Sequence, residues 1–412
     1  MWNALQACSD ERIGSVNMKI HMARSFSPLL VLGHIVNDTF SNLLSGLLPI
    51  ITILFGLSYL LAGLVATIFS VTSSILQPLL GRWFDRTHST WLLQAGLTLN
   101  CIGMSLSGIS PNYVVLLFLV GTAGLGSAAF HPPAFSTVVK STSSSKGGAM
   151  GIFLSGGNTG FFLGPIVAGG LVSAFGLSGT LLLLPVGLSI AILLFKVQVQ
   201  KVRASTLTLK TAQPANKRLL AQLATITALR SITLQTGVTF LPMYFVARGE
   251  SIFLATAVAS IWLGVGVLGQ IGGGFISDRI GRRPVIVTSL LAGTALFYGF
   301  LLAAGFLSLF LLAVSGLVLY ASWSVIVVMS SEAAPSNVGA VSGFMLGFSI
   351  GVGGLAALGF GAVADILGLY TAFFLFTAFA LVGGLLALGL PAQATGITDT
   401  KVPPRQFAFL EK

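Results

Sequence analysis

The chain has few charged side chains for its length. Of its 412 residues, 21 are Lys or Arg and 10 are Asp or Glu, so charged residues make up only 8% of the sequence. A water-soluble protein uses about 25% charged residues to cover its surface. The composition therefore excludes a soluble globular protein and, with 55% hydrophobic residues, predicts an integral membrane protein.

Cysteine and histidine are also scarce. The two cysteines, Cys8 and Cys101, do not have the spacing of a disulfide framework or a metal site. The four histidines are scattered, and no His-rich metal motif or Gly-x-Ser-x-Gly motif lies on an apolar run. A Gly-x-x-x-x-Gly-Lys-Ser/Thr loop, which would bind ATP, is absent as well. We therefore expect no enzymatic activity, no metal and no cofactor.

The formal net charge of +11 does not predict nucleic-acid binding. A nucleic-acid surface needs basic residues gathered on one exposed face, whereas here they lie in short gaps between apolar runs. Cytoplasmic loops of membrane proteins retain Lys and Arg. With a cytoplasmic N-terminus, 19 of the 21 basic residues fall on the cytoplasmic side. The sequence thus predicts that both chain ends are cytoplasmic.

Apolar runs of about 20 residues, the length that crosses a bilayer, predict an all-α membrane protein with twelve transmembrane helices. The expected spans cover residues 28–50, 60–80, 91–109, 113–138, 148–172, 179–195, 219–245, 252–275, 285–304, 307–330, 339–363 and 370–390. The expected organisation is a cytoplasmic tail (1–26), a six-helix bundle (27–195), a cytoplasmic linker (196–218), a second six-helix bundle (219–390) and a cytoplasmic tail (391–412).

Short motifs recur between the two expected bundles. The run 81–86 (GRWFDR) reappears as 274–279 (GFISDR), 193 residues later. The run 148–153 shares its Gly-Ala start and its final Phe with 339–344, 191 residues later. Many transporters consist of two similar halves. The repeats therefore predict two pseudo-symmetric six-helix bundles.

The run 274–283 (GFISDRIGRR) resembles a loop signature of the major facilitator superfamily, and the resemblance covers about residues 27–390. It implies the fold of that family, with twelve helices in two bundles. The glycine allows close helix approach, and the aspartate can accept hydrogen bonds from a helix N-terminus while it pairs with an arginine. We expect a conformational latch on the cytoplasmic side, formed by Gly81, Asp85, Arg86, Gly274, Asp278, Arg279, Arg282 and Arg283. The N-terminal copy departs from the signature after Arg86.

Glycines on the fifth expected span are similar to a signature of drug and proton antiporters in this superfamily. The matching residues are Gly151, Gly160, Gly164 and Pro165, whereas the final glycine pair lies one residue late because Ala168 intervenes. Glycines four residues apart form a flat face, and Pro165 removes a backbone donor. The alternative is a tightly packed helix with no link to antiport.

A third set of motifs resembles the fosmidomycin-resistance branch of the superfamily. The motifs are HIVND (34–38), QP (77–78), FHP (130–132), GGN (156–158) and LRS (229–231). The resemblance implies an exporter that exchanges protons for a small anionic phosphonate drug. Pro133 stands where that branch is expected to carry a glutamate, so a carboxylate that would have joined the proton path is absent.

Asp38 and Arg230 are ionisable groups near the middle of expected spans, and they lie 192 residues apart, close to the repeat distance. Ionisable groups inside a bilayer normally face the bundle interior and serve function. We expect the two side chains to face each other across a central cavity. Asp38 is the expected proton-coupling group, or else an acid satisfied by a helix end or by Asn37. Arg230 either binds an anionic substrate through its planar fork or forms a permanent ion pair with Asp38 or another acid.

Two histidines join the proton-coupling prediction. His34 is one turn before Asp38 and either relays protons or packs, and His131 relays protons or ends a helix before two prolines. Further residues are expected to bind substrate, although hydroxyls can also bond to their own helix and the aromatic rings can serve packing or the membrane interface; they are Asn37, Asn158, Gln77, Ser73, Thr227, Trp262 and Trp323.

The sequence therefore predicts a secondary active transporter. We expect it to export a small anionic or amphipathic, drug-like compound by proton antiport with alternating access, giving efflux and drug resistance. The alternative is a proton-coupled importer of an organic anion or metal chelate. The expected partners are the substrate, protons and lipid, without nucleic acid. The expected setting is the prokaryotic inner membrane, with the chain as a monomer.

Overall fold

The computed structural model describes residues 28–87, 91–141, 146–197, 215–335 and 338–392. These residues are mostly helical and contain no strand. The first half holds α2 (Pro28–Phe55), α3 (Tyr59–Thr87), α4 (Leu92–Ser107), α5 (Tyr113–Ser141), α6 (Lys146–Phe175), η1 (Leu177–Leu183), α7 (Leu184–Leu193) and η2 (Leu194–Lys196). The second half holds α8 (Lys217–Ala247), α9 (Ile252–Ile280), α10 (Arg282–Leu302), α11 (Gly305–Tyr320), α12 (Ser322–Glu332) and α13 (Val338–Ala387).

Each predicted span falls on helix, but several boundaries differ from the prediction. The spans expected at 339–363 and 370–390 lie in α13, whose backbone turns at Gly368 (φ 82°, ψ 158°). The sixth span begins with a 3₁₀ segment, η1, and the tenth is divided at Ala321 between α11 and α12. Apolar periodicity does not mark such breaks, because the hydrophobic residues continue through them.

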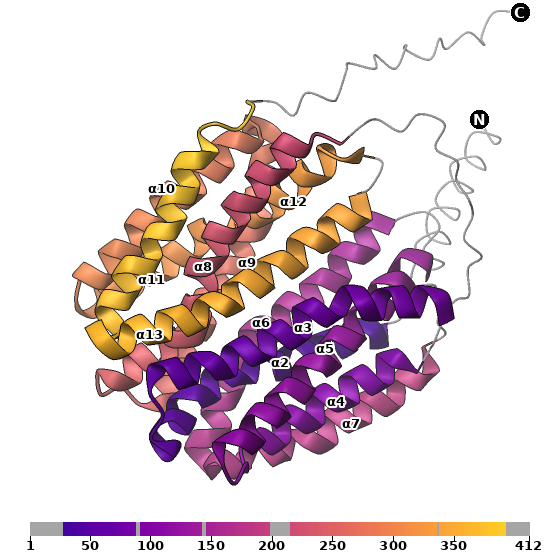
Figure 1. The fold of residues 1–412 in the computed structure, drawn as a ribbon, viewed down its shortest axis with the longest axis vertical. Helices are drawn as coiled ribbons and strands as arrows, with labels where there is room; N and C mark the ends of the chain where they lie inside the picture. The colour runs from indigo at the N-terminus through magenta and orange to yellow at the C-terminus, as the bar shows by residue number, and fades with distance from the viewer. Residues whose placement is uncertain (1–27, 88–90, 142–145, 198–214, 336–337, 393–412) are drawn as a thin grey trace, which may run out of the picture.

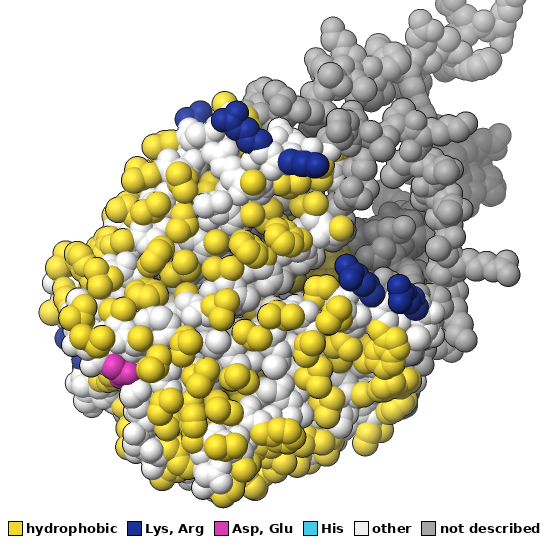
Figure 2. Space-filling view, in the orientation of Figure 1, with side chains coloured by type: hydrophobic (Ala, Val, Ile, Leu, Met, Phe, Trp, Pro, Cys, Tyr) yellow, Lys and Arg dark blue, Asp and Glu magenta, His cyan; other side chains and the backbone are white. Residues whose placement is uncertain are grey.

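The outer surface of the described structure is suited to lipid. Nine segments of the described residues are long and apolar enough to cross a membrane. Large side chains such as Phe306 and Ile366, each 81% exposed, lie on that surface. Figure 2 shows one face covered by hydrophobic side chains, with most of its Lys and Arg side chains along the upper right edge. The chain is therefore a multi-pass membrane protein.

The helices form two groups that follow the order of the chain (Figure 1). In the N-terminal half, α2 packs along α6, and α5 packs between α3 and α4. In the C-terminal half, α8 packs along α13, and α11 packs against α9 and α10. The halves meet where α3 lies against α13 and where α6 lies against α9.

Small residues bring α2 and α6 into close contact. A Cβ atom added to Gly160 would collide with the backbone of Ile35, and one added to Gly164 would lie 2.5 Å from the Cβ of Asn42. A Cβ on Gly46 would meet the Pro165 carbonyl at 2.7 Å. Such contacts let two backbones approach closely, and they place the polar residues of α2 directly against α6.

The two halves touch closely at one end and separate toward the other. Near the start of α3, a Cβ on Gly361 would collide with the backbone of Tyr59. Farther along, a Cβ on Gly351 would lie 3.7 Å from Ser74, and one on Gly343 would meet nothing within 4 Å. The gap widens toward the end that carries Thr87 and Glu332, which is the predicted cytoplasmic end.

Candidate functional site

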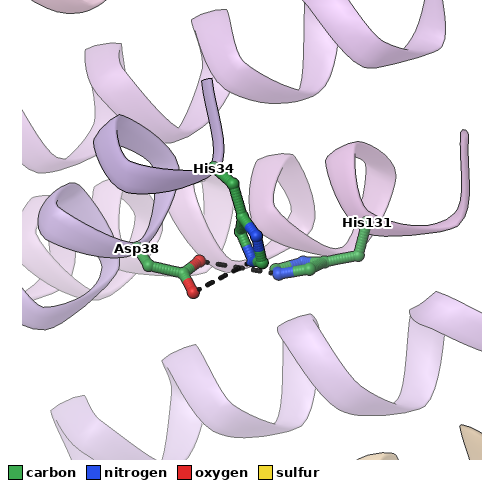
Figure 3. A group of neighbouring side chains, drawn as sticks. All are labelled: His34, Asp38 and His131. Carbon is green, nitrogen blue, oxygen red and sulfur yellow. Dashed lines mark ion pairs between the residues drawn. The ribbon is translucent and has the colours of Figure 1, made fainter. Parts of the chain in front are cut away.

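The carboxylate of Asp38 faces two histidine rings (Figure 3). Its Oδ2 is 3.3 Å from Nε2 of His34 on the same helix, α2. Its Oδ1 is 3.5 Å from Nε2 of His131 on α5. The 34–38 spacing places both α2 side chains on one helix face, whereas only the packing of α5 brings His131 to them. We call these three residues the Asp38 cluster.

Both histidine rings are held by backbone carbonyls. Nδ1 of His34 lies 2.8 Å from the carbonyl oxygen of Phe153, and Nδ1 of His131 lies 2.8 Å from that of Ser127. A carbonyl oxygen only accepts hydrogen bonds, so each Nδ1 must carry a proton and donate it. The Nε2 atoms therefore remain as the two ring positions that can bind or release a cation beside Asp38.

Of the two roles expected for His131, the one at a helix end is wrong. Helix α5 continues past Pro132 and Pro133 to Ser141. Pro132 and Pro133 lack the backbone N–H groups that would bond the carbonyls of Ala128 and Ala129. Nδ1 of His131 bonds to the carbonyl of Ser127, the residue just before them. The ring is thereby directed toward Asp38 from inside the helix.

A chain of amides positions the carboxylate of Asp38. Asn37 donates a hydrogen bond of 2.9 Å from Nδ2 to Asp38 Oδ1. Asn100 on α4, which is fully buried, donates to the Asn37 side-chain oxygen at 3.0 Å and to the Asn37 backbone carbonyl at 2.9 Å. The donation to Oδ1 fixes the orientation of the Asn37 amide, so that its NH₂ group faces Asp38.

Helix α6 closes the other side of the cluster. The Phe153 ring stacks on the His34 ring with centroids 4.1 Å apart and planes inclined by 22°. At Gly157 a Cβ would collide with the His34 ring and lie 2.8 Å from Asp38 Oδ2. The close packing of α6 on the cluster therefore requires glycine at position 157, because any side chain would collide with His34 and Asp38.

The Asp38 cluster also has the composition of a metal site. One ligand atom from each of its three residues lies within 4.8 Å of the others. Imidazole nitrogen and carboxylate oxygen are both ligands of divalent transition metals. The sequence prediction of no metal did not anticipate this, since His131 is 93 residues from Asp38 in the chain.

Arg230 occupies a separate buried position in the C-terminal half. It is 4% exposed, and its Nε donates a hydrogen bond of 2.9 Å to Ser322 Oγ. The guanidinium carbon lies 5.7 Å from the Tyr320 ring centre and 5.2 Å from that of Trp323. Among the described residues no carboxylate forms an ion pair with Arg230, so the expected pairing with Asp38 or another acid is not found.

A cavity of about 340 Å³ lies between the two halves. One wall is α6 and the other is formed by α9 and α12, and the lining includes Ser155, Asn158, Gln270, Phe275 and Ser324. The side chains of Asn158 and Gln270 make no hydrogen bonds to other described residues, so their amides are available to a ligand. Neither Asp38 nor Arg230 lines this cavity, although Ser324 is next to Trp323 in the chain.

Several other predicted substrate residues make contacts inside their own half. Ser73 donates to the carbonyl of Ser70 on its own helix, and Thr227 is fully buried beside Met345. Trp262 is 1% exposed and donates to Ser315 at 3.2 Å, which is a packing position. Gln77 is half-buried and has no hydrogen bond among the described residues.

The C-terminal copy of the repeated loop motif forms ion pairs. Arg282 pairs with Asp278 and, at 3.2 Å, with Glu332. These contacts join the end of α9, the start of α10 and the end of α12, all within one half. Asp85 lies in α3, but its side chain is outside the described part of the structure.

The remaining latch residues do not join this network. Arg86 and Arg279 are exposed and Arg283 is half-buried, and none of them forms an ion pair with a described residue. A Cβ on Gly81 would lie 3.6 Å from Pro132 of α5, and one on Gly274 would lie 3.5 Å from Ser324 Oγ.

Two residues of the site region are missing from the sequence predictions. Asn100 looks like an ordinary polar residue within an apolar run. Asp365 on α13 accepts hydrogen bonds from the backbone amides of Tyr59 (2.6 Å) and Leu60 (2.9 Å) at the start of α3. A carboxylate inside a long apolar stretch is the signal that could have identified Asp365.

Comparison with known proteins places the chain in a family. The family model described as Major Facilitator Superfamily matches residues 30–358. The chain is 29% identical to the "Uncharacterized MFS-type transporter YfnC" of Bacillus subtilis (strain 168), over 89% of this chain and 93% of the relative. It is 28% identical to the "Fosmidomycin resistance protein" of Escherichia coli (strain K12), over 81% of this chain and 85% of the relative.

A solved structure has the same fold. A bacterial homolog of the human lysosomal transporter Spinster, in an inward-facing and occupied conformation, superposes with a TM-score of 0.77. The alignment has 15% sequence identity and covers 87% of this chain and 95% of the other. Together with the two bundles and their repeated loop motifs, these matches establish that the chain belongs to the Major Facilitator Superfamily and is a transporter.

Proposed function

We propose that this transporter exports a small anionic or amphipathic compound in exchange for protons by alternating access. The single observation that carries the proposal is the arrangement of the two halves. They seal against each other near Tyr59 and separate around a cavity at the predicted cytoplasmic end. A substrate entering this cavity from the cytoplasm would leave on the other side after the halves rock, as in other transporters with two repeated halves.

Arg230 is the proposed partner for an anionic substrate. A buried guanidinium without a carboxylate partner is costly, and a bound anion would offset that cost. Its planar fork suits phosphonate or carboxylate oxygens. Trp323 stacks near the guanidinium and Ser324, the next residue, lines the cavity, so the first turn of α12 would connect the cavity to Arg230.

The Asp38 cluster is the proposed proton-coupling group. A carboxylate flanked by two imidazole nitrogens can change its proton content as the site alternates between the two sides of the membrane. His131 is a second proton-binding group beside Asp38. We propose that it takes the place of the glutamate that the sequence lacks at position 133. Neutral Asn158 and Gln270 would hold the uncharged part of the substrate.

The relative named Fosmidomycin resistance protein supports efflux as the direction and a phosphonate as the substrate class. We further propose that the chain lies in the prokaryotic inner membrane as a monomer with both ends in the cytoplasm. The bias of Lys and Arg toward one side of the predicted topology supports that orientation.

Transport in everted membrane vesicles tests this proposal. The expected result is uptake of a phosphonate such as fosmidomycin when an imposed proton gradient makes the vesicle interior acidic. Asp38→Asn should abolish gradient-driven uptake, whereas Glu250→Gln, which removes an exposed acid from a loop, should transport normally. Unchanged uptake by Asp38→Asn would refute the role of Asp38. Gradient-driven release from the vesicles would indicate import instead.

A further inference from the structure

We propose that the Asp38 cluster binds a divalent transition metal ion, such as Zn²⁺ or Co²⁺, through Nε2 of His34, Nε2 of His131 and the Asp38 carboxylate. The proposal goes beyond proton exchange, because it assigns a second kind of ligand to these side chains. It depends on the contacts of the cluster and not on the transport activity.

The first argument is the spacing of the ligand atoms. A charge-assisted N–H···O bond is about 2.7–2.9 Å long, whereas the two Nε2 atoms lie 3.3 and 3.5 Å from the carboxylate oxygens. Two ligands of a tetrahedral zinc ion, with bonds of about 2.0–2.2 Å, are about 3.4 Å apart. Each histidine nitrogen thus lies at about the separation of neighbouring ligands from one of the two carboxylate oxygens, and the three ligand atoms lie within 4.8 Å of one another.

The second argument is the set of hydrogen bonds that hold the three ligand side chains in place. Metal-binding histidines almost always donate their other ring N–H to a carbonyl or carboxylate, which fixes the tautomer and the ring orientation. Both rings do so here, to the carbonyls of Phe153 and Ser127. The carboxylate is held in turn by Asn37. All three ligands thus have the outer contacts of a metal site.

The third argument is access. The side chains of Asp38 and His131 are 17% and 18% exposed, whereas that of His34 is 4% exposed. An ion can therefore approach from the side of Asp38 and His131. On the side of Gly157, where a Cβ would collide with the His34 ring, the cluster is closed by the backbone of α6.

Metal binding would have a consequence for transport, and this part rests on the proposed function. A bound ion would occupy the Nε2 atoms and the carboxylate oxygens to which protons would otherwise bind. We therefore expect micromolar Zn²⁺ to inhibit gradient-driven export. The metal would act as a regulator of the same site.

Binding of Co²⁺ to the purified full-length protein in detergent tests the proposal. The protein should carry no histidine tag. We expect about one ion per chain, with the intense visible absorption of a tetrahedral cobalt site. His131→Gln and Asp38→Asn should each weaken binding by at least about tenfold, since even outer-contact changes have that effect. A matched control, His21→Gln with His88→Gln, removes the two other histidines of the sequence and should bind as the wild type does.

X-ray absorption of the zinc-loaded wild type decides the question even if a variant fails to fold. The expected spectrum shows two imidazole ligands with Zn–N distances of about 2.0–2.1 Å. Absence of stoichiometric binding, a site with oxygen ligands only, or loss of binding in the His21/His88 control would overturn the proposal. Transport by the metal-free wild type would remain intact in each of those cases, so this failure differs from failure of the proposed function.

Discussion

The Asp365 carboxylate in the C-terminal half accepts a hydrogen bond of 2.6 Å from the backbone N–H of Tyr59 in the N-terminal half. Its second oxygen accepts from Leu60 N–H at 2.9 Å. The first amides of a helix have no partner within that helix, so Asp365 caps α3 from the opposite half. The contact stabilises the conformation in which the predicted outer end is closed.

Removing that cap should favour opening at the outer end. Asp365→Ala is expected to shift the conformational equilibrium by about 1 kcal/mol, or roughly fivefold, which is the typical value of an N-cap. Spin labels at Ile109 and Glu250, which lie in exposed loops of the two halves, should report a longer distance. Asp365→Asn retains an oxygen acceptor and should give a smaller change. An unaltered distance distribution in Asp365→Ala would show that the cap does not hold the halves.

Asn100 should support the Asp38 cluster through Asn37. Asn100→Ala removes the donor to the buried side-chain oxygen of Asn37, which costs about 1–3 kcal/mol, and frees the amide that faces Asp38. The Asn37 backbone carbonyl still accepts from Ser41 Oγ. We expect lower thermal stability in detergent and slower proton-driven transport. Ser105→Ala on the same helix is the control, because Ser105 Oγ is buried without a hydrogen-bond partner among the described residues. Equal behaviour of the two variants would contradict this role.

Arg230→Lys should retain charge but lose the planar fork. One charge-assisted hydrogen bond is worth about 1.5–3 kcal/mol, so the Kd for a phosphonate should rise roughly 10- to 150-fold. Calorimetric titration of purified protein measures this change. The control is Arg248→Lys, since Arg248 caps the C-terminal end of α8 and contacts Tyr244 there. The Kd of this variant should stay near that of the wild type. A wild-type Kd in Arg230→Lys would argue for a structural role only.

Gly157→Ala should disrupt the packing of α6 on the Asp38 cluster. The added Cβ would collide with the His34 ring, and overpacking of this kind costs about 1–3 kcal/mol. We expect a lower Tm and loss of proton-driven transport. Gly170→Ala lies on the same helix, where a Cβ meets nothing within 4 Å, and should be tolerated. If both variants have the same Tm, the close approach at Gly157 is not required.

The sequence predicted the helical class, the membrane setting and the general position of each helix, because lipid exposure imposes long apolar runs with few charges. It also predicted Asp38, His34 and Arg230 as ionisable groups inside the helix bundles, because a charged or titratable side chain within an apolar run is costly in a bilayer. It did not predict the break at Gly368 or the 3₁₀ segment η1, because hydrophobicity alone does not record backbone turns.

The partners of these groups were decided by tertiary structure. Asp38 contacts His131, 93 residues away, and Asn37 is oriented by Asn100 on α4, while Arg230 lies among Ser322, Tyr320 and Trp323. Equal depth in two repeated halves predicted that Asp38 and Arg230 would face each other across a central cavity. Depth fixes only the position along the membrane normal, whereas helix rotation and packing determine which side chains meet. The side-chain contacts between helices, and the proton and ligand binding that depend on them, were therefore decided by the tertiary structure and not by the sequence pattern.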